Sequence, residues 1–512
     1  MPRADPWWRS AVFYQIYPRS FADSDGDGIG DLEGIRRRLD HLEWLGVDAV
    51  WICPFYRSPM TDFGYDVADY CDVDPLFGTL DDFDRLVAEA HERGIRVIVD
   101  WVPNHTSDRH PWFVEARSSR DSPRRDWYIW VDGDPATLPN NWRAAFGGDA
   151  WTWDGATGQW YLHLFLPTQP DLNWRNPDVA AAMHETLRFW IDRGVDGFRI
   201  DVVQGLAKDP TFPDDPPAQV LPHAAVNDCG DTHEILRGLR RLVERYSPVP
   251  LLLGEVYLLD TATVAGYVGA GDELHLAFDF TSLYARWDAG AWRRCIELVE
   301  TEFGARGAWP TWTLSNHDNP RHRTRYGGSE RRARAAAVLL LTLRGTPFVY
   351  NGEELGLEDA AVPFEREVDP GGRDGCRSPL PWDASPGHGW AGAEPWLPWS
   401  PEPETRNVAG LRASESSILH LYRRLLAARR ASAALGVGSW RSLEAPAGVL
   451  AYERAEGGDR RVVLVNFTSE AADAGVDGRW QVEVDSDGLL EGEGYPARLP
   501  GDAAVILRPS VE

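Results

Sequence analysis

The chain has 512 residues, a length that predicts more than one domain. Its 43% apolar and 26% charged residues are typical of a globular protein, and the formal charge of −27 argues against nucleic acid or an anionic membrane surface as a partner. The five cysteines are widely spaced and form no C-x-x-C pair, and neither a leader nor an apolar run of 18 residues is found. These features predict a soluble, cytoplasmic protein with reduced thiols.

Predicted strands and helices alternate along the first hundred residues. Apolar strands are expected at 11–17, 47–52 and 95–100, and helices at 32–45 and 80–93. Short connections between such elements are typical of parallel β/α architecture. The alternation stops between 104 and 170, where Trp, Pro, Gly and Asp are frequent. This stretch predicts a small inserted domain that leans over the end of the sheet.

The alternation resumes with a helix at 179–191 and a strand at 197–201. Four further strands are predicted, which makes eight and indicates a closed (β/α)8 TIM barrel: 249–255, 274–280, 309–314 and 347–350. A long loop (353–407) and a closing helix (416–430) follow, and then short alternating strands typical of an antiparallel β-sandwich. The predicted domains are the barrel (1–103 and 171–430), the insert (104–170) and the C-terminal β domain (431–512).

Acidic residues stand at the ends of three predicted barrel strands. Asp201 ends the fourth strand, and Arg199 lies two residues earlier, so both side chains point the same way. Glu255 and Asp318 end the fifth and seventh strands. Carboxylates that converge at the carboxyl ends of barrel strands suit acid/base and nucleophilic chemistry at a glycosidic carbon. The alternatives are a structural Arg–Asp pair and a divalent-metal site, although a metal site would need closer spacings.

A glycine-rich loop after the first strand carries a carboxylate at every second position: Asp23, Asp25, Asp27 and, further on, Asp31. Oxygen ligands in this pattern suit a hard cation. The loop is not an EF-hand, because Gly34 stands where an EF-hand has its bidentate Glu. The alternative is a solvated Asp/Gly turn.

Five segments together carry a resemblance to a known family. Asp100–His105, Gly197–Asp201, Gly254–Val256 and Asn316–Asp318 resemble, in this order, the four conserved regions of the α-amylase family, glycoside hydrolase family 13. Gln169–Asn173 resembles a further region typical of the α-glucosidase and oligo-1,6-glucosidase branch. The resemblance extends over essentially the whole chain.

The resemblance implies roles for individual residues. Asp201 matches the nucleophile, Glu255 the general acid/base and Asp318 the transition-state stabiliser. The other matched residues bind sugar in the first subsite: Arg199, His105 and His317 contact it, Tyr65 stacks on it, Phe165 lines the pocket, and Asp62 pairs with Arg377 to seal it. Val202 follows the nucleophile, where similar enzymes vary with linkage preference.

The acidic loop is similar to the calcium site of the family, which holds magnesium in some members. The implied ligands are Asp23, Asp25, Asp27, the Ile29 carbonyl and Asp31. Two departures concern the subfamily: Asn351 replaces a frequent Gln, and Asn319 occupies a variable position.

The expected function is that of a retaining, exo-acting α-glucosidase that releases glucose from short α-glucosides, as a monomer or homodimer. The first alternative is a transglucosylase or glucoside isomerase, of the sucrose or trehalose type, that shares the glucosyl-enzyme intermediate. The second is a catalytically dead relative that serves as a binding or transporter-associated subunit. Such a relative would have lost a carboxylate, and all three are present.

Overall fold

The computed structural model describes residues 6–216, 228–390 and 392–510. Its centre is a sheet of eight parallel strands in the order β11-β10-β9-β5-β2-β1-β13-β12. The two end strands of this ladder are linked by Thr311 Oγ1, which donates to the Ala277 carbonyl at 3.0 Å. The predicted (β/α)8 barrel is therefore confirmed. Its strands are β1 (Phe13–Ile16), β2 (Ala49–Ile52), β5 (Arg96–Trp101), β9 (Gly197–Ile200), β10 (Leu251–Glu255), β11 (Leu276–Phe278), β12 (Thr311–Thr313) and β13 (Thr346–Tyr350).

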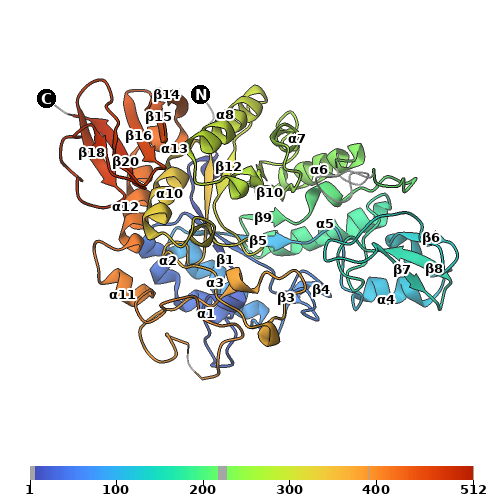
Figure 1. Ribbon diagram of the computed structural model, residues 1–512. Helices are drawn as coiled ribbons and strands as arrows, with labels where there is room; N and C mark the ends of the chain where they lie inside the picture. The colour runs from blue at the N-terminus through green and yellow to red at the C-terminus, as the bar shows by residue number, and fades with distance from the viewer. Residues whose placement is uncertain (1–5, 217–227, 391, 511–512) are drawn as a thin grey trace.

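Amphipathic helices surround the barrel (Figure 1). In α3 (Leu80–Glu92), Phe83 and Leu86 are buried against the sheet, and Thr79 begins the helix with a capping box. The helix expected at 32–45 is two helices, α1 (Leu32–Arg37) and α2 (Leu39–Leu45), because Arg38 leaves the helical conformation. The other barrel helices are α5 (Pro177–Asp192), α6 (Gly230–Val243), α7 (Thr261–Gly266), α8 (Ala289–Ala305), α9 (His322–Arg325), α10 (Glu330–Thr342) and α12 (Ile418–Ala431). Within the described ranges no helix is long and apolar enough to cross a membrane.

A small β domain interrupts the barrel between β5 and α5. It contains α4 (Pro111–Ser118) and a three-stranded antiparallel sheet of β6 (Trp130–Asp132), β8 (Gln159–Leu162) and β7 (Trp151–Asp154). Its core is largely tryptophan, with Trp142 fully buried. In Figure 1 it forms the right-hand end of the molecule, next to the short hairpin of β3 (Tyr56–Arg57) and β4 (Asp69–Val73).

The C-terminal domain begins after α13 (Ala433–Val437). A five-stranded antiparallel sheet is faced by a two-stranded ribbon, β17 (Ala472–Asp473) with β19 (Arg498–Leu499). The sheet strands are β14 (Ser439–Leu443), β15 (Val449–Glu456), β16 (Asp459–Asn466), β20 (Ala504–Pro509) and β18 (Trp480–Asp485). Buried Arg454 donates to the Gly438 carbonyl at 2.9 Å and to the carbonyl of Thr342 at the end of α10, which joins this domain to the barrel.

The long loop after β13 contains α11 (Val408–Arg412) and returns to the barrel mouth. It lies on the acidic loop after β1: the amide of Ala393 donates to the Gly26 carbonyl at 2.9 Å, and that of Trp396 to the Gly28 carbonyl at 3.0 Å. A Cβ at Gly28 would clash with the Glu394 carbonyl oxygen, so this close approach requires glycine. The two loops therefore support each other.

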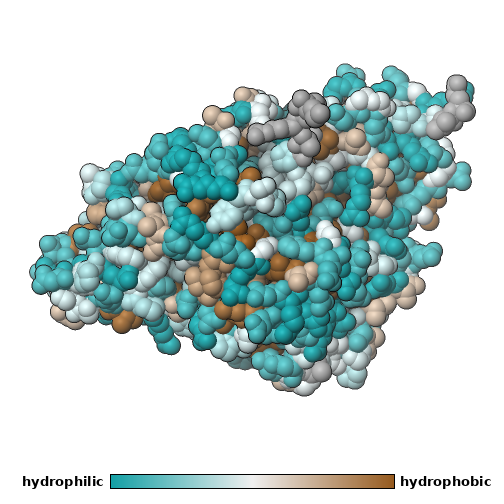
Figure 2. All heavy atoms as spheres, turned by 180° about the vertical axis from the view of Figure 1, so that it is seen from behind, coloured by the Kyte–Doolittle hydropathy of each residue, from teal (hydrophilic) through white to brown (hydrophobic). Residues whose placement is uncertain are grey.

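All five cysteines are unpaired. Figure 2 shows the molecule from behind, where most of the surface is hydrophilic and hydrophobic residues gather toward the middle of the face. This surface agrees with the formal charge of −27 of the sequence.

Candidate active site

Three carboxylates from three strand ends lie in one cavity. Asp201 follows β9, Glu255 is the last residue of β10, and Asp318 lies five residues beyond β12. All three line a cavity of about 310 Å³ between the barrel, the inserted domain and the long loop. Parallel strands place their carboxyl ends at one rim, which is why residues more than fifty positions apart in the sequence meet here.

Arg199 connects two of these carboxylates. It lies on β9 beneath Asp201 and is 1% exposed. One terminal nitrogen lies 2.6 Å from Asp201 Oδ1 and 2.8 Å from Asp100 Oδ1, and the other lies 2.9 Å from Glu255 Oε2. A guanidinium in this fork geometry orients each carboxyl group. The alternative of a structural Arg–Asp pair would involve one carboxylate, whereas Arg199 binds three carboxyl groups.

Burial raises the pKa of Asp201 well above its usual value. Arg199 opposes this rise, while the charges of Glu255 and Asp100 and a hydrogen bond with Glu255 add to it. Three carboxyl groups thus share one guanidinium in a site of low dielectric. Because their negative charges repel one another, a cluster of this kind retains a proton more readily than separate carboxylates do. A nucleophile and a general acid built from two carboxyl groups require one of them ionised and the other protonated.

Asp318 has the opposite electrostatic environment. Burial alone would raise its pKa, but His317 when protonated and the guanidinium groups of Arg373 and Arg377 outweigh burial, and the pKa lies well below the usual value. The Asp318 carboxylate accepts from Arg373 at 2.9 Å and from Arg377 at 3.1 Å. Asp318 is therefore ionised at neutral pH.

Two buried histidines flank the carboxylates. Burial lowers the pKa of His317 to about 3 and that of His105 to about 4, so both imidazoles are neutral at neutral pH. Tyr65 lines the cavity and stacks on His317, with ring centroids 5.4 Å apart and planes inclined by 6°. The ring of Phe165 lies 5.1 Å from His105. The structure thus brings these predicted residues to one side of the site.

The predicted ion pair between Asp62 and Arg377 is wrong. Asp62 pairs with Arg373, whose terminal nitrogen lies 2.7 Å from its carboxylate. Arg377 is fully buried, donates to the His317 carbonyl at 2.7 Å and pairs with Asp318 and Asp369. The reason is local: Arg373 precedes a short 3-10 helix (Asp374–Arg377) and faces the cavity, and Arg377 at its other end points inward.

Arg373 was missed although it stands four residues before Arg377. Its guanidinium bridges Asp62 and Asp318, pairs with Asp369 at 2.6 Å, and lies 4.9 Å from the ring centre of Phe146 in the inserted domain. No periodicity marks such a loop residue, and the sole signal was a second arginine in the same segment. Other cavity-lining residues that were not predicted are Ala145, Phe146, Leu164, Gln204, Gly205, Tyr257 and Asn319.

Val202 has a strained backbone. Its φ of 45° and ψ of 48° are left-handed, a conformation that β-branched residues rarely adopt. The Val202 amide donates to Glu255 Oε2 at 3.1 Å. The strain thus directs an N–H at one catalytic candidate from the residue next to another, and the Val202 side chain lines the cavity.

Lys208, the sole lysine in the sequence, connects the inserted domain to the barrel. It is buried, and its Nζ lies 2.8 Å from Asp171 and 2.7 Å from the Asn104 side-chain oxygen. Gln169, two residues before Asp171, donates to Asp62 at 3.0 Å and lies 3.2 Å from His105. The segment that leaves the inserted domain therefore holds one wall of the cavity in place.

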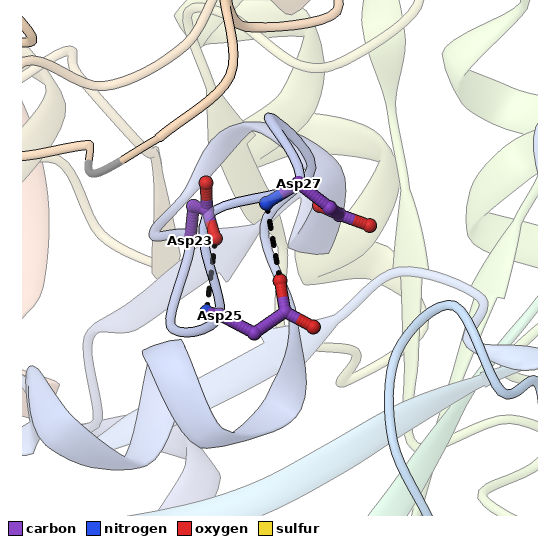
Figure 3. A group of neighbouring side chains, drawn as sticks. All are labelled: Asp23, Asp25 and Asp27. Carbon is purple, nitrogen blue, oxygen red and sulfur yellow. Dashed lines mark hydrogen bonds between the residues drawn. The ribbon is translucent and has the colours of Figure 1, made fainter.

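None of the residues of the acidic loop lines this cavity, and Figure 3 shows how three of their side chains lie. Asp23, Asp25 and Asp27 each offer an oxygen, and these oxygens lie within 4.8 Å of one another. Backbone amides order them, since Asp23 accepts from Asp25 N at 3.1 Å and Asp25 accepts from Asp27 N at 3.2 Å. The carboxylate of Asp31 instead caps α1, accepting from Gly34 N at 2.7 Å and from Ser24 N at 2.8 Å.

Comparisons with known proteins extend over nearly the whole chain. The sequence profile of the α-amylase catalytic domain matches residues 15–438. A probable α-glucosidase of Rhizobium meliloti is 43% identical, over 91% of this chain and 90% of its own. An oligo-1,6-glucosidase of Parageobacillus thermoglucosidasius is 36% identical, over 91% of both chains. The crystal structure of the α-glucosyl transfer enzyme XgtA superposes with a TM-score of 0.92 and 40% identity, over 99% of this chain and all of its own.

Proposed function

Because the chain belongs to the α-amylase family of glycoside hydrolases, in its α-glucosidase branch, we propose that its cavity removes single glucose units from the ends of short α-glucosides with retention of configuration. The observation that carries this proposal is the bridge that Arg373 makes between Asp62 and Asp318. An ion-paired guanidinium across the cavity closes it behind the first sugar, so a long chain has no exit.

The two chemical steps follow from the positions of Asp201 and Glu255. In the first step Asp201 attacks the anomeric carbon while Glu255 gives its proton to the glycosidic oxygen, so that the bond to the leaving alcohol breaks. In the second step Glu255 takes a proton from water, which attacks the same carbon and releases Asp201. Two inversions leave the configuration unchanged. The contact of both carboxyl groups with one guanidinium keeps them near each other and supports retention, because inverting enzymes separate their carboxyl groups by about 6.5–9.5 Å.

Asp318 and Arg199 support these steps electrostatically. The low pKa of Asp318 keeps a negative charge in the cavity, which can stabilise the positive charge that develops on the sugar ring. Arg199 holds Asp201 and Glu255 at the two terminal nitrogens of one guanidinium, so neither carboxyl group needs to reorient between the steps.

The test measures products and their anomers. Fresh glucose released from an aryl α-glucoside is expected to be the α-anomer by proton NMR, and maltotriose is expected to lose glucose while soluble starch keeps its viscosity. A first product in the β form would overturn retention. Rapid loss of starch viscosity would show an open cleft and overturn the closed pocket.

A transglucosylase is the second candidate, because the similar structure XgtA is named an α-glucosyl transfer enzyme. The apolar part of the cavity wall, which includes Phe146, Leu164 and Tyr257, could bind an acceptor in place of water. The same glucosyl-enzyme intermediate would then react with an alcohol. Product analysis at high acceptor concentration separates the two: new glucosides in excess of glucose would favour the transfer reaction.

We also propose that the acidic loop holds a structural divalent cation, calcium or magnesium. The 4.8 Å limit on the distances between the Asp23, Asp25 and Asp27 oxygens fits a calcium ion, whose ligands lie at about 2.3–2.6 Å and thus at most about 5 Å apart. Partial burial and the charges of Asp25 and Asp23 raise the pKa of Asp27, and a cation would relieve this repulsion. A melting temperature that calcium raises and chelator lowers would support the site. An unchanged melting temperature would show that the acidic loop is a turn that binds no cation.

A further inference from the structure

Gln15 is a buried polar residue on β1 with no part in the chemical steps above. It is 1% exposed and lies in the barrel interior, where a polar side chain needs partners. Its side-chain nitrogen lies 2.8 Å from His317 Nδ1 and 3.3 Å from Cys53 Sγ. His317 in turn neighbours Asp318, with Nε2 3.3 Å from the carboxylate.

Hydrogen-bond geometry decides where the His317 proton lies. The Tyr65 hydroxyl has one proton and donates it to Asp100 Oδ2 at 3.0 Å. His317 Nε2 lies 2.6 Å from the same hydroxyl oxygen, so this nitrogen must be the donor. A neutral imidazole has one N–H, which leaves Nδ1 as the acceptor of the Gln15 amide.

The alternative, in which His317 is protonated on Nδ1, is unfavourable both at Asp318 and at Asp100. An imidazole protonated on Nδ1 would turn the Nε2 lone pair toward the Asp318 carboxylate, 3.3 Å away. The Tyr65 hydroxyl would then have to donate to His317, and Asp100 would lose one of its donors. Buried acceptors that lose a donor are costly, so the four side chains favour one direction of donation, from Gln15 to Asp100.

We propose that Gln15 is a positioning residue that fixes His317 in the neutral form protonated on Nε2, so that this N–H faces Tyr65 and the Asp318 side of the cavity. The consequence for catalysis rests on the function proposed above. A fixed donor beside Asp318 needs no reorientation when charge develops on the sugar, so its loss is expected to lower kcat more than to raise KM.

Two substitutions at Gln15 are expected to change the pH dependence of kcat in different ways. Gln15→Met has a similar volume but cannot donate, so kcat is expected to fall about tenfold at every pH, with KM changed by less than about twofold. Gln15→Glu places a carboxylate against Nδ1, which favours a protonated Nδ1 and raises the pKa of His317. As the pH rises, His317 would then lose its proton from Nε2, so the alkaline limb of kcat should move to lower pH.

Other groups face His317 and could contribute to that pH limb. They are Tyr17, Tyr65, Arg199, Asp318, Arg373, Cys376 and Arg377. All of them are retained in both Gln15 variants, so a shift seen in Gln15→Glu alone belongs to the pair of residue 15 and His317.

A spectroscopic measurement tests the proton position without activity. In protein with 15N-labelled histidine, two-bond proton–nitrogen correlations distinguish the two neutral forms, and His317→Gln assigns the signal. The wild type is expected to show Nε2–H, and Gln15→Glu a protonated Nδ1. This outcome would stand even if the enzyme failed to act on α-glucosides, so the two proposals fail separately.

Cys53→Ala is the matched control, because it removes the other neighbour of the Gln15 amide and leaves the His317 contact in place. Its kcat and KM are expected within about twofold of the wild type. A wild-type His317 protonated on Nδ1, or wild-type kcat and pH profile in both Gln15 variants, would overturn the proposal.

Discussion

The molecule contains two clusters of three carboxylates that are built in different ways. Asp201, Glu255 and Asp318 lie in a cavity and are held by guanidinium groups. The acidic loop after β1 holds its three carboxylates near the surface, and backbone amides order them. One cluster has its positive charges built in, and the cation proposed above would supply the positive charge of the other.

This difference reflects what each cluster must do with a proton. In the cavity, burial and the charges of neighbouring carboxyl groups raise the pKa of Asp201 although Arg199 opposes the rise, whereas the charges of Arg373 and Arg377 help to lower the pKa of Asp318 against burial. Unequal pKa values separate the roles of chemically similar groups. In the loop each carboxylate accepts from backbone amides and offers an oxygen close to those of the other two, which suits shared ligation of one ion. Changes in the cavity should therefore affect turnover, and changes in the loop should affect stability.

The largest expected effect is on the cavity. Asp201→Asn removes the nucleophile and keeps the shape, so kcat should fall by several orders of magnitude, as for other residues of covalent catalysis. Turnover of an aryl α-glucoside and the melting temperature would be measured together. A variant that retains a tenth of wild-type turnover would show that Asp201 does not attack the substrate.

Arg373→Met tests the bridge across the cavity. It leaves Asp62 and Asp318 without their shared partner, so kcat/KM for maltose should fall roughly 10²-fold or more through lost positioning. Asp62→Ala should cause a loss of similar size, and the double variant should lose less than the two single losses combined. Full additivity would show that the two side chains act independently.

Asp25→Ala tests the other cluster. The loop supports the long loop through Gly26 and Gly28, so weaker cation binding should lower the melting temperature by about 2 °C or more and abolish its response to chelator. The value of kcat is expected within about twofold of the wild type, because the loop lies outside the cavity. A loss of turnover without a loss of stability would contradict the separation of the two clusters.

The smallest effect concerns specificity within the cavity. Val202→Thr keeps the β-branch and adds a hydroxyl next to Glu255, so the ratio of maltose to isomaltose hydrolysis should change severalfold. Both linkages should be cut by the wild type, with a weak preference for α-1,4. An unchanged ratio would remove Val202 as a determinant of linkage.

The predicted fold and the convergence of the catalytic candidates both derived from local periodicity. Short apolar strands that alternate with amphipathic helices indicate a barrel whatever the loops do, and a parallel barrel places the ends of its strands at one rim. Asp201 and Glu255 could therefore be placed together from the sequence alone. The same reasoning covered the antiparallel strands of the C-terminal domain.

The partners of the loop side chains were decided by tertiary structure alone. Whether Arg373 or Arg377 meets Asp62 depends on one turn of 3-10 helix, and the use of Asp31 as a helix cap depends on where α1 begins. The left-handed backbone of Val202 and the partner of Gln15 also follow from contacts with distant residues. A strand directs its side chains by a period of two that the sequence displays, whereas a loop side chain takes its direction from partners that only the folded chain brings near.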